Sequence, residues 1–170
     1  MSELDEAWAL ALAEAEHKAR LAGRGDVADY LALRNSNDLL RKAGVDWLMT
    51  TFVNLAGEAN RAGAGIQLSN SEGHRFRIGT STMVGRLVAL SNGVRKLSVE
   101  AGWPRVPRDG IVRGGGLAAA NILHLGIRSA GEELLLSRST TGTPHWTSIT
   151  RRSREFHESD IRRHLAILLQ

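Results

Sequence analysis

The spacing of apolar residues changes once along the chain, near residue 64, and this change limits the possible folds more than any other feature. Before it, apolar residues recur every three to four positions, which places them on one side of a helix. After it, short segments alternate apolar and polar residues between turns, as in an antiparallel sheet. A last helical pattern, with Ile161, Leu165 and Leu168, ends the chain. Helices, then strands, then a helix predict an α+β fold.

We expect a single domain over residues 1–170, because a chain of this length buries enough apolar surface for one core. Its expected parts are a helical segment, 1–62, an antiparallel β segment, 63–156, and a C-terminal helix, 157–170. The helical segment holds about three helices, which we expect to end near Gly23 and Gly44, since glycine adopts the left-handed cap conformation without strain. Asp46 would then cap the third helix.

The sheet should contain about five to seven strands, and its clearest part is a hairpin. Asn92-Gly93 lies between two alternating runs, which is the strongest short-range signal for a two-residue turn. A turn at these two residues places Val88 opposite Leu97. One face of the hairpin is apolar and predicts core positions at Val84, Val88, Leu90, Leu97, Val99 and Ala101.

Further strands are indicated at residues 66–68, 74–78, 133–137 and 145–149. A turn at 70–73 is expected to separate the first two, with Phe76 pointing into the core. Residues 111–125 fit either a helix, because alanines favour one, or a strand that another element crosses closely. The small residues favour a strand in the first part of this stretch.

Charge is distributed unevenly along the chain. Residues 1–62 hold seven basic and ten acidic side chains, a net charge of −3, whereas residues 63–170 hold fifteen and eight, a net charge of +7. Nineteen of the 22 basic residues are arginine, whose planar fork of donors suits phosphate and carboxylate groups. The basic half could bind an external anion, or it could pair with the acidic helices of the same chain.

Segment 102–116 is the main candidate for a binding site. It holds two of the three prolines, and proline restricts the backbone, so that an ordered loop loses less entropy on binding. Guanidinium groups could converge there on a phosphate or carboxylate, beside glycine amides that could cradle an anion. The candidate ligand-binding residues are Trp103, Arg105, Arg108, Arg113, Gly114, Gly115 and Gly116. A basic surface beside them is expected from Arg75, Arg77 and Lys96.

These residues also have structural explanations. Trp103 could fill the core instead of stacking on a base, and the three glycines could permit tight packing. Asp109 could stabilise a turn. Glu100 is a possible general base or an ion-pair partner. His124 lies in an apolar run, where a histidine more often belongs to the core than to a catalytic site.

The sequence lacks the motifs of several enzyme classes. Without cysteine, disulfides, thiolate nucleophiles and cysteine metal sites are excluded. No phosphate loop, dinucleotide fingerprint or H-E-x-x-H helix occurs. His157 and His164 lie about two helical turns apart, but no third metal ligand accompanies them. We therefore expect no metal and no cofactor, identify no catalytic residue, and favour a protein that is not an enzyme.

Location and membrane association are addressed by two further features. No apolar run reaches the roughly 18 residues that a membrane span needs. The first residues, Met1 to Glu6, are acidic where a signal peptide would be basic. We therefore expect a cytoplasmic protein that does not interact with a membrane.

Three function classes remain. The favoured one is a binding module for nucleic acid or another polyanion, which uses the basic β half and segment 102–116. The second is an oligomeric interaction protein whose helices bury apolar side chains against another subunit. Its candidate interface or core residues are Trp8, Leu12, Tyr30 and Phe52. The third is an enzyme or binding protein for an anionic small molecule, with a pocket at segment 102–116.

Overall fold

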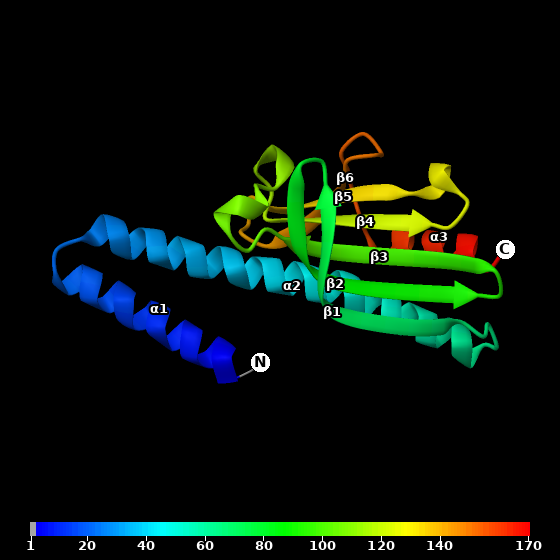
Figure 1. Ribbon diagram of the computed structural model, residues 1–170, viewed down its shortest axis with the longest axis horizontal. Helices are drawn as coiled ribbons and strands as arrows, with labels where there is room; N and C mark the ends of the chain where they lie inside the picture. Colours follow the sequence, from blue (N-terminus) through cyan, green and yellow to red (C-terminus); the bar gives the residue numbers. More distant parts are fainter. Residues whose placement is uncertain (1–2) are drawn as a thin grey trace. The chain divides into compact units, whose positions relative to one another are not determined.

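The computed structural model describes residues 3–170, and among them the side chains from residue 7 onward apart from Trp8. Within this range the chain folds as α+β, with three α-helices and one antiparallel sheet of seven strands (Figure 1). The backbone divides into two compact units, a helical one that ends at Leu40 and a larger one from Arg41 to Gln170. No helix in the described range is long and apolar enough to cross a membrane.

The first unit is a helical hairpin made of α1 (Glu3–Leu21) and the beginning of α2 (Gly25–Arg61). The turn between the helices depends on Gly23, whose φ of 73° is the left-handed conformation that glycine adopts without strain. After it, the backbone N–H of Arg24 donates a hydrogen bond to the carbonyl of Ala19 at 2.9 Å. The expected helix end near Gly23 is therefore confirmed.

The expected helix end at Gly44 is wrong, because α2 runs without a break from Gly25 to Arg61. A glycine inside a helix costs about 1 kcal/mol relative to alanine, so another interaction must require it. A Cβ atom built on Gly44 would lie 2.6 Å from both Cδ atoms of Leu136, a sheet residue. Gly44 thus lets the sheet pack closely on the helix. Asp46 caps no helix and instead pairs with Arg86 at 3.0 Å.

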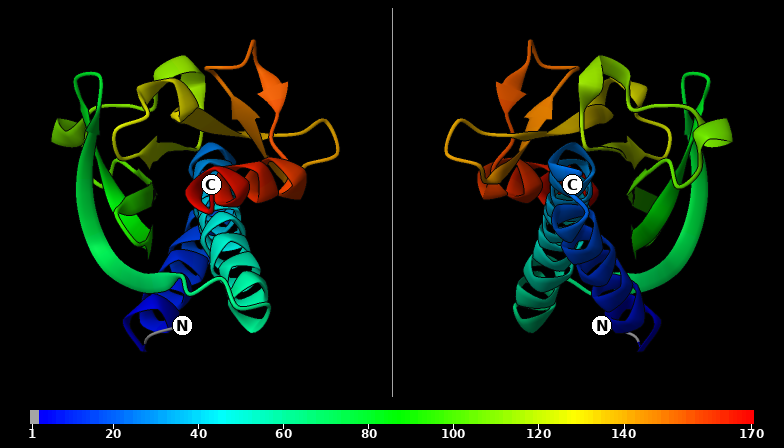
Figure 2. Two further views of the ribbon diagram at one scale, coloured as in Figure 1. Left: turned by 90° about the vertical axis from the view of Figure 1, so that its right-hand side faces the viewer. Right: turned by 90° about the vertical axis from the view of Figure 1, so that its left-hand side faces the viewer.

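The sheet is a meander in which each strand pairs with its neighbours in sequence order. Its strands are β1 (Gln67–Ile78), β2 (Ser81–Asn92), β3 (Arg95–Trp103), β4 (Ala118–His124), β5 (Glu132–Arg138), β6 (Pro144–Ser148) and β7 (Arg154–Glu155). The last helix is α3 (Glu158–Leu168). Within the larger unit, the sheet curves around α3 and the second half of α2, as the end views in Figure 2 show.

The predicted hairpin exists, but its turn is one residue further along the chain. Strand β2 ends at Asn92 and β3 begins at Arg95, so the turn residues are Gly93 and Val94. Gly93 has a φ of 59° and Val94 does not have a positive φ, as in a type II′ turn. Leu90 therefore lies opposite Leu97, and the predicted pairing is wrong by two residues.

A shift of two residues leaves every side chain on its predicted face, because side chains in a strand alternate with a period of two. The core accordingly contains five of the six predicted hairpin positions, Val88, Leu90, Leu97, Val99 and Ala101, whereas Val84 is only partly buried. On the helix side, Leu48, Met49 and Phe52 of α2 are completely buried, which places Phe52 in the core.

Two other expectations need correction. Residues 70–73 form no turn, because β1 continues through them with a bulge at Gly73, whose φ is 64°. The first part of 111–125 is not a strand, and β4 begins only at Ala118. The preceding segment, 104–117, contains two short 3₁₀ turns, η1 (Pro107–Asp109) and η2 (Arg113–Gly115). This loop covers a second small apolar cluster, made of Phe76, Met83, Val112 and Ala119.

Candidate functional site

Asp109 fixes the conformation of the predicted binding loop. Its side chain is buried, and its Oδ2 accepts the backbone N–H of Arg105 at 3.2 Å. Its Oδ1 lies 3.4 Å from Nη2 of Arg75 on β1. A Cβ atom on Gly110 would lie 2.5 Å from Oγ of Ser81, which donates to the carbonyl of Ile111 at 2.8 Å. The loop is thus tied closely to the start of β2.

Trp103 and Arg105 form one structural pair. Trp103 is 8% exposed and belongs to the core, which is the structural role considered for it. The guanidinium carbon of Arg105 lies 3.8 Å from the centroid of the indole ring. Nε and Nη2 of Arg105 also donate to the carbonyl of Val84, at 3.3 and 3.1 Å. The indole is therefore covered, and a nucleic acid base has no free face of Trp103 on which to stack.

The three glycines have different roles. Gly114 and Gly115 are exposed and have φ values of 76° and 74°, which side chains rarely adopt. The N–H of Gly115 is already used, because it donates to the carbonyl of Val112 at 3.3 Å. A Cβ atom on Gly116 would overlap the side chain of Leu135. Gly116 therefore permits close packing, whereas Gly114 and Gly115 are required by the conformation of the backbone.

Three exposed arginines of this region, Arg77, Arg108 and Arg113, form no ion pair with a carboxylate in the described part of the chain, and we call them the arginine surface. Nη2 of Arg77 donates to the carbonyl of Thr80 at 3.3 Å. A Cβ atom on Gly79 would lie 3.9 Å from Nη2 of Arg113. The side chains of Arg77 and Arg113 thus both reach the β1–β2 turn, from two separate segments.

Arg108 is the third member of the arginine surface, whereas the remaining predicted basic residues lie elsewhere or are engaged. Arg108 belongs to η1, which contacts β2, and within the described residues it makes no ion pair or hydrogen bond. Lys96 does not join the arginine surface, but lines a shallow depression of about 260 Å³ with residues of β1 and β2. Arg75 pairs with Asp109, and Arg105 lies over the ring of Trp103.

Glu100 and His124 take part in two different polar clusters. Glu100 Oε2 lies 2.8 Å from His74 Nε2, and its Oε1 accepts a bond from Asn121 at 3.1 Å. His124 is 7% exposed, and its Nε2 lies 2.9 Å from Nδ1 of His164 on α3. The expectation of a core histidine at this position is confirmed.

The second cluster continues to Glu132, a residue that sequence reasoning missed. Nε2 of His164 lies 2.9 Å from Oε2 of Glu132, and because a carboxylate only accepts, this nitrogen carries the proton. Nη2 of Arg163 donates to the same oxygen at 2.9 Å. Glu132 and His164 are almost completely buried, so this chain of groups anchors α3 to the sheet and offers no room for a substrate.

His124, Glu132, Arg163 and His164, which we call the buried cluster, include two groups whose acidity is changed. Burial lowers the pKa of His124 to about 4, with help from the charges of His164 and Arg163. Burial acts to raise the pKa of Glu132, but hydrogen bonds from His164 and Ser148 and the charge of His164 outweigh it and lower this pKa to about 2. Glu132 is therefore ionised and His124 neutral at neutral pH.

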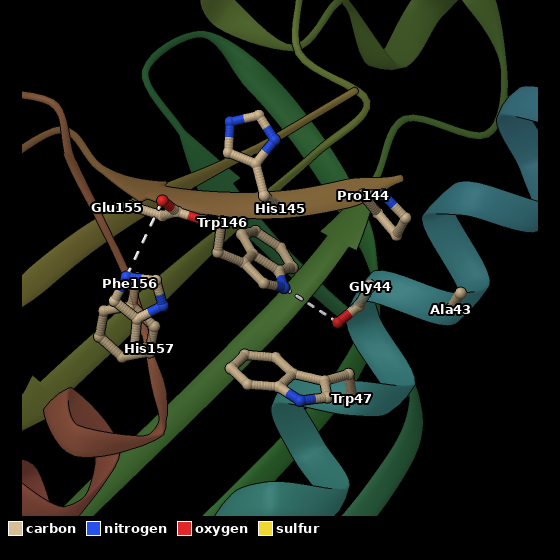
Figure 3. A pocket seen from close by; sticks show the side chains of 9 residues that line it. All are labelled: Ala43, Gly44, Trp47, Pro144, His145, Trp146, Glu155, Phe156 and His157. Carbon is tan, nitrogen blue, oxygen red and sulfur yellow. Dashed lines mark hydrogen bonds and ion pairs between the residues drawn. The ribbon is translucent and has the colours of Figure 1, made fainter. Parts of the chain in front are cut away.

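A cavity of about 280 Å³ lies between α2 and strands β6 and β7, and we call it the aromatic pocket (Figure 3). It is lined by Ala43, Gly44, Trp47, Pro144, His145, Trp146, Glu155, Phe156 and His157. The sequence could not reveal it, because these residues come from three separate segments that only the fold brings together. The aromatic pocket and the depression beside Lys96 both lie outside segment 102–116.

Neither a group of metal ligands nor a similarity to known proteins points to a further site in the described residues. Among the described residues, no group of three or more His, Asp or Glu side chains is placed to hold a metal ion. Comparisons with protein-family models, with curated proteins and with solved structures found no match for this chain.

Proposed function

We propose that this protein binds the phosphate backbone of nucleic acid through the arginine surface, Arg77, Arg108 and Arg113. The observation that supports the proposal is that the side chains of Arg77 and Arg113 both reach the β1–β2 turn. The nearby carboxylate of Asp109 already has a cationic partner in Arg75, so it does not cancel the charge of the surface. Exposed guanidinium groups without anionic partners suit phosphate oxygens, which accept hydrogen bonds from them in pairs.

Pairing within the chain accounts for other arginines but not for these. Arg86 pairs with Asp46, and Arg162 approaches Glu58 at 3.5 Å, so the second half of α2 does bind part of the basic half. No such ion pair to Arg77, Arg108 or Arg113 occurs in the described part of the chain. The intramolecular alternative therefore leaves the arginine surface available.

The surface is suited to phosphate groups rather than to bases. Trp103 and Phe76, the aromatic residues of this region, are 8% and 7% exposed. Proteins that bind single strands stack bases on exposed aromatic side chains, whereas phosphate contacts carry no sequence information. We therefore expect binding to duplex DNA without sequence preference, with dissociation constants of about 10⁻⁴ to 10⁻⁶ M at physiological salt.

The test is fluorescence anisotropy with a labelled duplex DNA. The triple variant Arg77→Ala, Arg108→Ala and Arg113→Ala should bind at least about tenfold more weakly than the wild type. A matched control removes the exposed Arg24, Arg34 and Arg61, and should bind like the wild type. An equal loss in both triple variants would assign the binding to net charge alone, and no binding by the wild type would refute the proposal.

A second candidate function is self-association through the helical unit. Leu10, Leu21 and Tyr30 are 72%, 76% and 62% exposed, although large apolar side chains on helices are normally buried. Leu10 and Leu21 lie eleven positions apart, about three helical turns, and so on one side of α1. Leu12, by contrast, is 8% exposed, and the side chain of Trp8 lies outside the described residues.

Sedimentation equilibrium tests this second function. The wild type should form dimers at micromolar concentration, and Leu10→Glu with Leu21→Glu should make it monomeric, because charges at a buried apolar contact are costly. Val94→Glu is the matched control, since Val94 is 94% exposed in the β2–β3 turn. A wild type that stays monomeric would exclude this function.

A further inference from the structure

The aromatic pocket combines aromatic rings with a carboxylate. Trp146 is 2% exposed, and its Nε1 donates to the carbonyl of Gly44 at 2.9 Å, so that its indole is held in one orientation. Phe156 is 3% exposed and is held by packing in the core. In Figure 3, the indole of Trp47 faces the cavity from α2, across from Trp146 on β6.

Trp47 is not explained by the core. It is 41% exposed, whereas Trp146 and Phe156 of the pocket are almost completely buried. None of the ring–ring contacts among the described residues joins Trp47 to Trp146 or to Phe156. A large apolar ring therefore stands partly in water beside an open cavity, where a ligand could cover it.

The charge of the lining favours a cation. Glu155 contributes a carboxylate, and none of the nine described lining residues is lysine or arginine. The nearest partner of the carboxylate within the pocket is Nε2 of His157, at 3.8 Å, and both side chains are more than half exposed. The neighbouring Arg154 does not neutralise Glu155, because Arg154 pairs with Asp160.

We infer that the aromatic pocket binds a small organic cation that carries a quaternary or methylated ammonium group. The faces of indole and phenyl rings are negative and attract such cations, most strongly those of tryptophan. The Glu155 carboxylate adds attraction at the rim of the pocket. A volume of about 280 Å³ lies just below the usual range of pockets for drug-sized ligands, about 300–1,000 Å³, and suits a smaller molecule. This inference does not depend on the arginine surface.

Isothermal titration calorimetry with choline tests the inference, and the neutral carbon isostere 3,3-dimethylbutan-1-ol is the control ligand. Choline should bind at least about fivefold more tightly than the alcohol, since only choline attracts the ring faces. Equal binding of the two, or tighter binding of indole than of choline, would show an apolar pocket and overturn the inference. If choline does not bind to the wild type, the amides of trimethyllysine and of unmethylated lysine are tested next. Binding of the trimethylated amide alone would show that the cation belongs to a modified side chain. Binding of neither amide would overturn the inference.

Variants connect the binding to the pocket. Trp47→Leu should abolish choline binding, whereas Trp47→Phe should retain part of it, because phenylalanine keeps an aromatic face. Glu155→Gln should weaken choline binding and leave the alcohol unaffected. Trp47 and Glu155 are exposed, so unchanged unfolding curves should accompany these losses. Choline binding that is unchanged in Trp47→Leu would place the ligand elsewhere and refute the assignment.

Discussion

Replacing His124 tests how the buried cluster links stability to pH. The pKa of His124 is about 4 in the folded protein, against 6.5 for an exposed histidine. The unfolded chain therefore takes up a proton near pH 6.5, whereas the folded protein takes it up only near pH 4. The stabilisation is complete above pH 6.5 and is lost as the pH falls from 6.5 through 4.

The size of the effect follows from the same two values. Each pH unit between them changes the free energy of unfolding by about 1.4 kcal/mol, so the wild type should lose about 2 kcal/mol through His124 between pH 8 and pH 5. His124→Gln keeps a polar nitrogen near His164 but does not titrate. Between pH 8 and pH 5, the free energy of unfolding of His124→Gln should therefore fall by about 2 kcal/mol less than that of the wild type.

Urea unfolding, followed by tryptophan fluorescence at a series of pH values, measures this difference. Groups distant from His124 titrate equally in both proteins, so the comparison isolates His124 together with its coupling to the neighbouring His164. His17→Gln changes an exposed histidine and should keep the pH profile of the wild type. Identical pH profiles for the wild type and His124→Gln would refute the reasoning.

Two further predictions concern stability. Glu132→Gln leaves Arg163 and His164 without their buried anion, and should lower the free energy of unfolding at neutral pH by about 3–5 kcal/mol; a loss below about 1 kcal/mol in urea unfolding would contradict this role. Gly44→Ala should destabilise the protein by about 1–3 kcal/mol because of the overlap with Leu136, although alanine favours helices. Gly57→Ala, where only the flexible end of Arg61 is near, should instead stabilise it by about 0.5–1 kcal/mol, and a thermal unfolding series in which both changes have the same sign would reject the explanation.

The sequence was most informative where a local pattern decides the structure. The change of period near residue 64 predicted the α+β fold, and the alternation around Gly93 predicted the core face of the hairpin although the turn lay one residue further on. Gly44 misled the prediction, because a contact with Leu136, far away in the sequence, makes glycine necessary inside the helix. Tertiary packing had overridden a local helix-end signal.

The candidate sites were less predictable, since they depend on long-range contacts. Arg105 and Arg113 looked equivalent in the sequence, but Arg105 covers Trp103 and Arg113 remains exposed at the β1–β2 turn. No local signal marks Glu132 as the partner of His164, because these residues meet only when α3 packs on the sheet. The aromatic pocket likewise joins segments that are separate along the chain.

The salt dependence of DNA binding tests the proposed function most directly. Each phosphate that the protein neutralises contributes about −0.9 to the slope of the logarithm of the association constant against the logarithm of the salt concentration. Three phosphate contacts, by Arg77, Arg108 and Arg113, predict a slope of about −3 for the wild type between about 50 and 200 mM salt. The triple alanine variant should lose most of this slope. A slope that is unchanged in the variant would contradict the assignment of nucleic acid binding to the arginine surface.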